Sequence, residues 1–483
     1  MKNEIEPSLR GIHAVRNGLL TILLAAAALP FVGCSGGSGG GASPAAATSS
    51  GGGAASGGSS GGTGASTGTG AGTSGSGSGA SGGGATTSST SAFQDFAALR
   101  ASIASLATAA QQARLDAFIA AKEVSVEGFP LRSGTRAAFV FKGRPAHAPI
   151  VAGDWDGWNS GQIALAEIGQ TDVWFVEADL GTADRHEYKL VVDGSWQSDP
   201  LNRKFTYDHV NSIANLAGSG KSHLELIPAF ASTALNNTRD VIVYLPAGYL
   251  DDAAARYPVL YLHDGQNVFD PDAMWGGWLA DQALDGNIAS GAIKKIIAVG
   301  AANTPGRMDE YTQVQDEPFG CGSGVSGGKA PRYARFIVNE LKPWVDARYQ
   351  TLPDRENTAI LGSSLGGLVS VYIGYAYPQV FKRVGGMSST FDWGSWCLHN
   401  PTVLDQVRAA GKQDFLLYID TGGGPNSASV DNYAVTVQFK QLVEGQGFVA
   451  GTDLLYYWDQ NAPHNEQSWA GRLWRPLQFW FHK

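Results

Sequence analysis

The nine residues AILGSSLGG (359–367) contain the pattern G-x-S-x-G with Ser364 at its centre. The pattern alone is weak evidence, because it also occurs in a low-complexity tract, as GGSGG (36–40), GASTG (64–68) and GASGG (79–83). Only the copy around Ser364 follows the apolar residues TAIL and precedes a long apolar segment. The chain on either side of Ser364 therefore decides what this copy means.

The residues before Ser364 predict a strand, and LGGLVSVYIGYAY (365–377) predicts a helix. A strand, a tight turn with serine at its tip and a helix together form a nucleophile elbow. Gly362 and Gly366 leave no side chain where strand and helix nearly touch. Because a serine hydroxyl is a weak nucleophile, Ser364 also predicts a base and an orienting acid elsewhere in the chain.

Residues 226–483 alternate apolar strand segments with helical segments. Helices are predicted over 332–349 and 468–481 by their apolar spacing. The predicted strands cover 239–246, 257–265, 294–303, 357–364, 383–389, 414–422 and 453–460. This alternation predicts an α/β fold with a mostly parallel central sheet covered on both faces.

Among the nine histidines, His464 is the best candidate for the base. It follows the last predicted strand and precedes the last helix, which fits the chain order serine, acid, histidine. His399 comes too early in the strand order, and His482 is terminal. His263 follows an early strand, where an oxyanion loop is expected.

Residues 226–483 resemble the esterase D family of α/β-hydrolases, which includes enterochelin esterases, feruloyl and acetyl xylan esterase domains and mycolyltransferases. The resemblance implies an α/β-hydrolase fold and a Ser-His-Asp triad. It also implies that the backbone N–H groups of Leu365 and Gln266 bind the oxyanion. The motifs that carry it are YLHDGQN (261–267), IAVGAANTPGRMDEYT (297–312), AILGSSLGGLVSVYIGYAYPQVF (359–381) and PHNEQSWAGRLW (463–474).

Two aspartates compete for the role of the triad acid. The acid belongs after the strand that contains FLLYID, because that strand end faces the histidine loop in this fold. Asp420 still lies at the end of the strand. In relatives the carboxylate comes about five residues later, where GGPN (423–426) offers none here. We therefore predict Asp431, the next carboxylate, with Asp420 as the alternative.

Residues 123–225 alternate apolar and polar residues between Gly, Asp, Asn and Pro, which predicts a small antiparallel β-sandwich of the immunoglobulin-like kind. This part resembles carbohydrate-binding module family 48 and the glycogen-binding module of AMP-activated kinase. The resemblance implies a glycan platform made by Trp158, Trp196 and Lys189; a purely structural role for the domain is the alternative. The matching stretches are GDWDGWN (153–159), YKLVVDGSWQSDP (188–200) and NSIANL (211–216).

The N-terminal part predicts export. Residues 1–34 have a basic region, a short apolar run and FVGC, as in a bacterial lipoprotein signal, so Cys34 is expected to be lipidated and to anchor the protein in the cell envelope. Plain secretion is the alternative. Residues 35–92 are almost wholly Gly, Ser, Thr and Ala, which predicts a flexible linker. Residues 93–122 predict a helical segment.

Charge and motif content narrow the function classes. The formal charge is −9 and no Lys/Arg block is present, which argues against nucleic acid as a partner. The sequence has no HExxH motif, no Cys/His cluster and no phosphate loop, so no metal or cofactor is expected. Cys321 and Cys397 predict one disulfide in an exported protein, with two free thiols as the alternative.

These observations favour an exported serine esterase that hydrolyses carboxylic esters through an acyl-enzyme, with acylated polysaccharide as a candidate substrate. A siderophore esterase of the enterochelin kind and an acyltransferase are enzymatic alternatives. A glycan-binding lipoprotein with an inactive hydrolase fold is an alternative from another class, but the presence of both Ser364 and His464 argues against it.

Overall fold

The computed structural model describes residues 91–182, 185–207, 210–215, 220–273 and 276–483. The predicted signal sequence with Cys34, and residues 35–90 of the predicted linker, lie outside the described residues. Within the described ranges, no helix combines the length and apolar character needed to cross a membrane.

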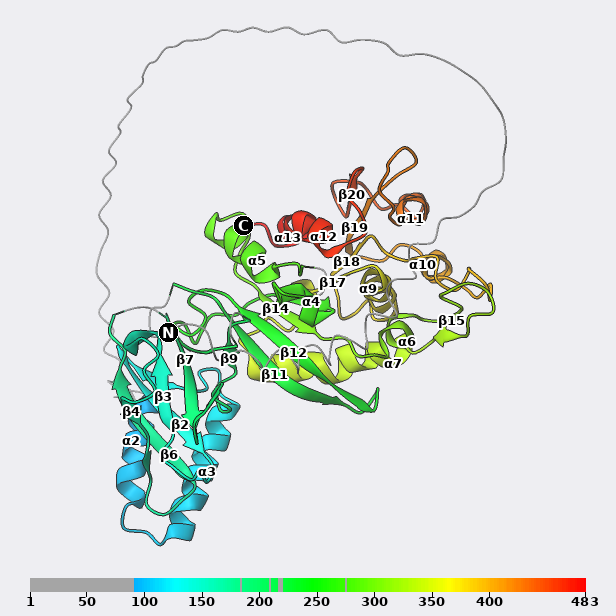
Figure 1. The fold of residues 1–483 in the computed structure, drawn as a ribbon. Helices are drawn as coiled ribbons and strands as arrows, with labels where there is room; N and C mark the ends of the chain where they lie inside the picture. The colour runs from blue at the N-terminus through cyan, green and yellow to red at the C-terminus, as the bar shows by residue number, and fades with distance from the viewer. Residues whose placement is uncertain (1–90, 183–184, 208–209, 216–219, 274–275) are drawn as a thin grey trace, which may run out of the picture. The chain divides into compact units, whose positions relative to one another are not determined.

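The predicted helical segment forms two helices, α2 (Ala92–Ile103) and α3 (Thr108–Glu123). Ser91 caps α2 by accepting a hydrogen bond from the Gln94 N–H, and the Gln94 side chain accepts one from the Ser91 N–H in return. Phe96 and Leu115 pack in one apolar cluster with Val140, which lies on strand β2 (Arg136–Lys142) of the N-terminal sheet β1-β2-β6-β5. These helices therefore cover one face of that sheet (Figure 1).

The N-terminal part is antiparallel, as predicted. One sheet has the strand order β1-β2-β6-β5, and strands of a second sheet pack against it around Phe139, Tyr188 and Leu190. The first sheet comprises β1 (Leu131–Ser133), β2 (Arg136–Lys142), β5 (Ala166–Glu167) and β6 (Val173–Asp179). The facing strands are β3 (Ile150–Gly153), β4 (Ile163–Ala164), β7 (Arg185–Val192), β8 (Ser195–Gln197), β9 (Lys204–Phe205) and β10 (Ser212–Asn215).

The C-terminal part contains the predicted, mostly parallel sheet. Its order is β20-β19-β18-β17-β13-β14-β12-β11, and all neighbours from β20 to β14 are parallel. The strands are β11 (His223–Ser232), β12 (Asn237–Leu245), β13 (Val259–His263), β14 (Ile297–Ala301), β17 (Thr358–Ser363), β18 (Arg383–Met387), β19 (Leu416–Gly422) and β20 (Leu454–Asp459). The fold class predicted from the alternation of strands and helices is confirmed.

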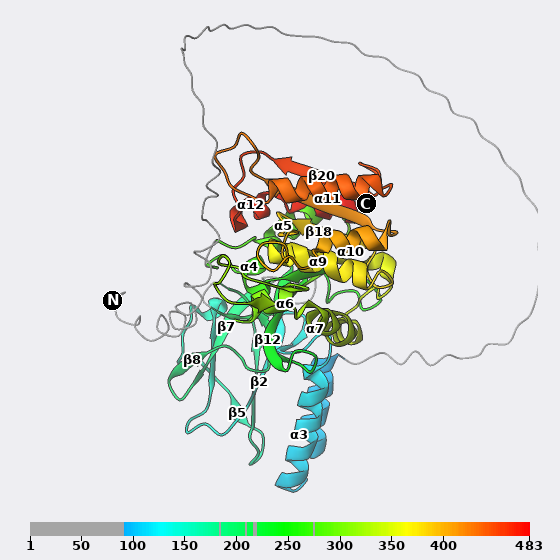
Figure 2. The same cartoon turned by 90° about the vertical axis from the view of Figure 1, so that its right-hand side faces the viewer.

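Helices cover both faces of this sheet (Figures 1 and 2). One apolar core includes Phe336, Val369 and Phe439, and the other includes Leu284 and Trp480. The first face carries α7 (Ala330–Arg335), the π-helical turn Phe336–Leu341, α8 (Lys342–Arg348), α9 (Leu365–Ala376), α10 (Val403–Ala410) and α11 (Tyr433–Gly445). The second carries α4 (Gly265–Phe269), α5 (Ala280–Ala289), α12 (Glu466–Arg472) and α13 (Trp474–Phe481).

Two predicted helices are divided in the structure. The segment predicted over 332–349 changes to a π-helical turn just before Pro343, a residue that has no N–H to donate to the preceding turn. The segment predicted over 468–481 consists of α12 and α13, which meet at Leu473.

Strand β11 joins the two parts of the chain. It pairs antiparallel with β12 on one side and with β9 on the other, so the second N-terminal sheet continues into the central sheet. Glu225 of β11 is buried, and its carboxylate accepts hydrogen bonds from Arg203 Nε (3.0 Å) and the Tyr349 hydroxyl (2.9 Å). The boundary predicted between residues 225 and 226 thus falls inside a shared strand.

Candidate active site

Ser364 lies at a sharp turn between β17 and α9, at the carboxyl end of the parallel strands. Its φ of 55° and ψ of −122° place a non-glycine residue in a sparsely populated backbone region. The Ser364 N–H donates to the carbonyl of Met387 (2.9 Å), and its carbonyl accepts from the Leu368 N–H (3.0 Å). These bonds hold the strained turn and leave the side chain half-buried.

The glycines around Ser364 are required by close approach. A Cβ atom on Gly362 would lie 2.5 Å from the backbone of Gly366 and 2.9 Å from Cδ2 of His263. Real Cβ atoms do not come that near to backbone, so a side chain at Gly362 would separate β17 from α9. The elbow geometry predicted from the sequence is present.

His464 and Asp431 are in direct contact. His464 Nδ1 lies 2.6 Å from Asp431 Oδ1. The Asp431 side chain is fully shielded from solvent, whereas 32% of the His464 side chain is exposed. An ionised carboxylate only accepts hydrogen bonds, so Nδ1 carries the proton and Nε2 is left to accept one.

The environment of Asp431 favours its ionised form. Burial raises the pKa of this carboxyl, but hydrogen bonds from His464, Ser388 and the Asn432 N–H outweigh burial and hold the pKa below its usual range. The Ser388 hydroxyl lies 2.6 Å from Asp431 Oδ2, and the Gly422 N–H donates to the same oxygen. Asp431 therefore has a different set of partners on each oxygen.

Asp420, the alternative acid, has other partners. Both of its oxygens accept from Arg472, at 3.1 and 3.2 Å, and Oδ2 also accepts from the Tyr418 hydroxyl at 2.6 Å. Burial raises the pKa of Asp420, although the Arg472 charge opposes this. In the described part of the chain, Asp420 makes no hydrogen bond to His464.

The Ser364 hydroxyl has one weak polar contact among the described residues, with Thr390 Oγ1 at 3.5 Å. No hydrogen bond between Ser364 and His464 is present in the described ranges. Catalytic hydrogen bonds are often long or misaligned without substrate and tighten when substrate binds. The structure thus brings His464 to Asp431, and it places Ser364 at the same edge of the sheet without a direct bond to His464.

Leu365 is the first residue of α9 and Gln266 the second residue of α4, and these helices follow neighbouring strands. β13 and β17 are parallel partners in the register Leu262 to Leu361, so α4 and α9 start side by side. Across the described residues, neither the Leu365 N–H nor the Gln266 N–H donates to a protein acceptor. Free N–H groups at the start of helices are well suited to bind negative charge.

Charged contacts hold the loop that contains Gln266. Asp264, just before α4, accepts from Arg307 Nε (2.7 Å) and from the Asn303 amide (2.6 Å). The Gln266 side-chain oxygen accepts from the Asn303 N–H (3.0 Å), which turns this side chain toward the protein. The loop is therefore ordered before any substrate binds.

His263 is excluded as a base by its surroundings. It is buried, and its Nδ1 lies 2.9 Å from the Tyr333 hydroxyl. Burial lowers the pKa of His263 to about 3. His263 is the last residue of β13 and packs against the glycines of the elbow, so its neutral imidazole has a structural place rather than a role in proton transfer.

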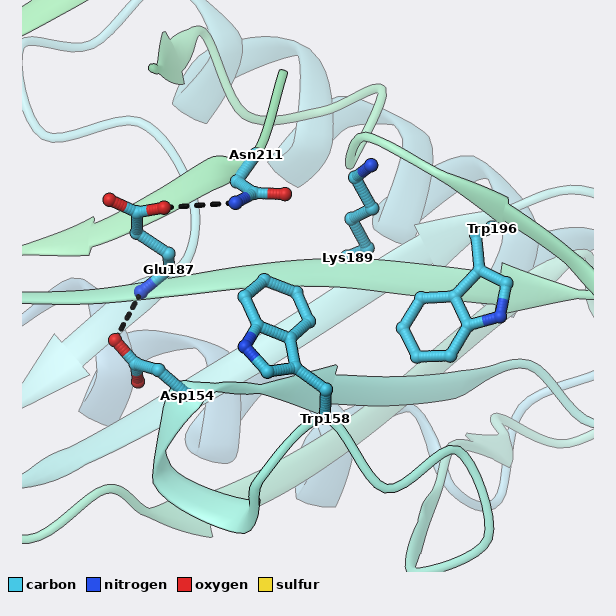
Figure 3. A pocket seen from close by; sticks show the side chains of 6 residues that line it. All are labelled: Asp154, Trp158, Glu187, Lys189, Trp196 and Asn211. Atoms are coloured by element: carbon cyan, nitrogen blue, oxygen red, sulfur yellow. Dashed lines mark hydrogen bonds between the residues drawn. The ribbon is translucent and has the colours of Figure 1, made fainter. Parts of the chain in front are cut away.

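The structure brings Trp158, Trp196 and Lys189 together on the N-terminal part. They line a hollow of about 470 Å³, together with Asp154, Glu187 and Asn211 (Figure 3). The two indole rings have centroids 6.4 Å apart at 48°, and 44% of Trp196 is exposed.

Hydrogen bonds order one side of this hollow. Asp154 accepts from the Glu187 N–H (3.0 Å), and Glu187 accepts from the Asn211 amide (2.9 Å), as the dashed lines in Figure 3 show. Trp155 instead stacks on Phe139 with a centroid distance of 5.6 Å and belongs to the core. The hollow is thus an ordered surface with two accessible aromatic rings.

Cys321 and Cys397 form the predicted disulfide, with Cα atoms 5.3 Å apart. Asp316 lies beneath it and accepts hydrogen bonds from the N–H groups of Gly394, Trp396 and Cys397. The two loops that follow α6 (Arg307–Tyr311) and β18 are thereby joined. Glu317 lies close to both sulfurs, but disulfide sulfurs are not thiolate ligands, so this group does not suit a metal.

The comparisons with known proteins assign the C-terminal part. Residues 232–479 match the family model described as "Putative esterase", so the chain belongs to this family of esterases. This confirms the family predicted from the sequence motifs.

Individual relatives are more distant. The chain is 30% identical over 162 residues to an endo-1,4-beta-xylanase/feruloyl esterase of Xylanibacter ruminicola, covering 33% of this chain and 20% of that protein. It is 30% identical over 146 residues to a siderophore triacetylfusarinine C esterase of Aspergillus fumigatus, covering 29% of this chain and 47% of that protein. The chain therefore spans less than half of either relative.

Among solved structures, ferric enterobactin esterase from Salmonella typhimurium is 17% identical with a TM-score of 0.42, covering 74% of this chain and 96% of that one.

Proposed function

We propose that this protein is a serine esterase in which Ser364 is the nucleophile, His464 the base and Asp431 the acid. The contact of 2.6 Å between His464 Nδ1 and Asp431 Oδ1, at the sheet edge where Ser364 occupies a strained elbow, is the observation that carries the proposal. Membership of the esterase family supports it. We assign the oxyanion role to the N–H groups of Leu365 and Gln266.

In the proposed reaction, Ser364 Oγ attacks the ester carbonyl carbon while its proton moves to His464 Nε2. The carbonyl oxygen becomes an oxyanion that accepts hydrogen bonds from the two N–H groups. The C–O bond to the alcohol then breaks, and the departing alcohol takes the proton from His464. Water repeats the sequence on the acyl-enzyme and releases the acid, which restores Ser364.

We propose acylated carbohydrate as the substrate class. The hollow formed by Trp158, Trp196 and Lys189 supports this, because apolar faces of sugar rings stack on exposed indole rings and a lysine can donate to hydroxyl oxygens. The similarity to a protein named endo-1,4-beta-xylanase/feruloyl esterase favours the same class.

A siderophore ester is the second candidate substrate, favoured by the similarity to a siderophore triacetylfusarinine C esterase. Against it, Arg307, the cation placed near the elbow by its bond to Asp264, is already neutralised by that carboxylate. A site for a strongly anionic iron complex would need an uncompensated positive charge.

An ester panel tests the function and separates these substrates. Acetyl, feruloyl, short-acyl and long-acyl esters of sugars, and a ferric siderophore lactone, should be incubated with wild-type protein and with Ser364→Ala. We expect turnover of carbohydrate esters that Ser364→Ala reduces to background. Turnover by folded Ser364→Ala equal to wild type would contradict the proposed nucleophile, and preference for the siderophore lactone would contradict the carbohydrate assignment.

A further inference from the structure

Ser388 occupies an unusual place directly behind Asp431. It follows the last residue of β18, is fully buried and has a φ of 45°. A left-handed backbone is unfavourable for serine and persists only where surrounding contacts impose it. Its N–H donates to both the carbonyl (2.9 Å) and Oδ1 (3.1 Å) of Asp420. Nothing in the motif pattern around Ser364 or His464 points to this residue.

We infer that Ser388 is a positioning residue that holds the Asp431 carboxylate toward His464 through a hydroxyl bond of imposed direction. The inference rests on the proposed function, since it concerns the acid of that triad. In the described part of the chain no hydrogen bond joins Ser388 to Ser364 or His464, so its hydroxyl acts on the site through Asp431.

The direction of the Ser388 bond follows from its second partner. Arg472 Nη2 lies 2.9 Å from Ser388 Oγ, and a guanidinium can only donate. The Ser388 oxygen is therefore the acceptor of that bond, and its own proton is free for another acceptor. Asp431 Oδ2, at 2.6 Å, is that acceptor. Arg472 thus makes the Ser388 hydroxyl a one-way donor to Asp431.

Arg472 is itself held in place. It is buried with Asp420 and bonds both oxygens of that carboxylate. Arg472 lies at the end of α12, the helix that starts two residues after His464, whereas Asp420 belongs to β19. A series of buried hydrogen bonds therefore connects the segment that contains His464 to the loop that contains Asp431. It runs through Asp420, Arg472, Ser388 and Asp431. In this arrangement the Asp420 carboxylate orients the Arg472 guanidinium.

The two oxygens of Asp431 consequently have separate tasks. Oδ2 accepts hydrogen bonds from Ser388 and from the Gly422 N–H, whereas Oδ1 accepts from His464 Nδ1 and from the Asn432 N–H. Without the Ser388 hydroxyl, the carboxylate could rotate away from the productive orientation. It would also carry more uncompensated negative charge toward the imidazole, which stabilises the imidazolium.

The test compares Ser388→Gly with wild type in the full-length protein on one activated ester. Glycine suits a φ of 45°, so this variant removes the hydroxyl without adding backbone strain. We expect a folded protein with a lower Tm, because buried Arg472 loses one acceptor, together with an unchanged KM and a kcat about 10- to 100-fold lower, the scale of a small misplacement of a catalytic group. We also expect the acid limb of the kcat/KM profile to move to higher pH.

Ser232→Ala is the matched control. The buried Ser232 hydroxyl also donates to a carboxylate at 2.6 Å, that of Glu340, but on β11 outside the site. Its loss should leave kcat and the acid limb at wild-type values. A purely structural Ser388 would behave in the same way as this control.

The double variant Ser388→Gly, Asp431→Ala shows whether Ser388 acts through Asp431. We expect its kcat to equal that of Asp431→Ala, and a further fall would overturn the inference. Wild-type kcat and pH profile in Ser388→Gly, beside an inactive Ser364→Ala, would overturn the inference and leave the proposed function standing. Full activity in Ser364→Ala would overturn both.

Discussion

The proposed catalytic groups around Ser364 follow the ends of separate strands, whereas the proposed binding groups around Trp158 lie on or beside neighbouring strands of one sheet. Asp431 follows β19, His464 follows β20, and their contact joins residues 33 positions apart. Trp158 lies just after β3 and Trp196 on β8, and β7 pairs with both strands. The three proposed catalytic residues span 100 positions, from Ser364 to His464, whereas the residues that line the hollow span 57, from Asp154 to Asn211.

The two regions also differ in backbone strain and in buried charge. The carboxyl end of the parallel sheet contains three non-glycine residues with positive φ, Asp264, Ser364 and Ser388, and a buried ion pair between Asp420 and Arg472. Of the six residues that line the hollow, five are exposed or half-buried, and only Trp158 has a positive φ. Substitutions at the sheet edge should therefore affect turnover or folding, and substitutions in the hollow should affect binding alone.

The largest expected effect separates the two aspartates at the sheet edge. Asp431→Asn should fold normally and lose about 10⁴-fold in kcat, because an amide cannot hold the required histidine tautomer. Asp420→Asn should instead lose about 3–5 kcal/mol of stability, because the buried Arg472 charge is left uncompensated. Kinetics on one activated ester and thermal unfolding followed by circular dichroism measure the two effects.

The contrast between these variants is the informative result. Both remove one buried carboxylate charge, Asp420 within β19 and Asp431 in the loop between β19 and α11, so each is the control for the other. Near-normal turnover in folded Asp431→Asn, together with lost turnover in folded Asp420→Asn, would show that Asp420 rather than Asp431 is the triad acid.

A smaller effect is expected in the hollow. The double variant Trp158→Ala, Trp196→Ala should lose glycan affinity by about 2 kcal/mol or more, the range of central aromatic residues in binding sites. Its retardation in a glycogen or starch gel should disappear, while kcat on a small soluble ester stays at the wild-type value. Trp474→Ala, which removes another exposed tryptophan, is the control and should migrate like wild type.

If the folded double variant and wild type migrate alike, the N-terminal part has a structural role. A fall in kcat on the small ester would show instead that the two regions are coupled. It would contradict the expectation that substitutions in the hollow affect binding alone.

The parts of this molecule that follow local patterns were predictable from the sequence. The strand before Ser364, the helix after it and the glycines around it follow from residues that are close together in the sequence. The seven predicted strands of the central sheet are present because each is an apolar run bounded by turn residues. The position of His464 followed from its place in the strand order.

The parts that depend on tertiary contacts were not predictable in this way. Pairing of β11 with β9 links segments with no motif in common, so the sequence suggested a domain boundary where the sheet is continuous. The role of Ser388 depends on a backbone angle and on contacts with Arg472 and Asp431, 84 and 43 residues away. A serine that follows a strand in the sequence indicates neither this backbone angle nor these contacts.

The most direct test of the central claim, that Ser364 is an activated nucleophile, is covalent labelling with a fluorophosphonate. The probe should add one phosphonyl group to the wild-type protein, as measured by intact mass, and peptide mapping should locate it on Ser364. Ser364→Ala should remain unlabelled under the same conditions. Unchanged labelling of Ser364→Ala, or labelling of wild type at another serine, would contradict the account.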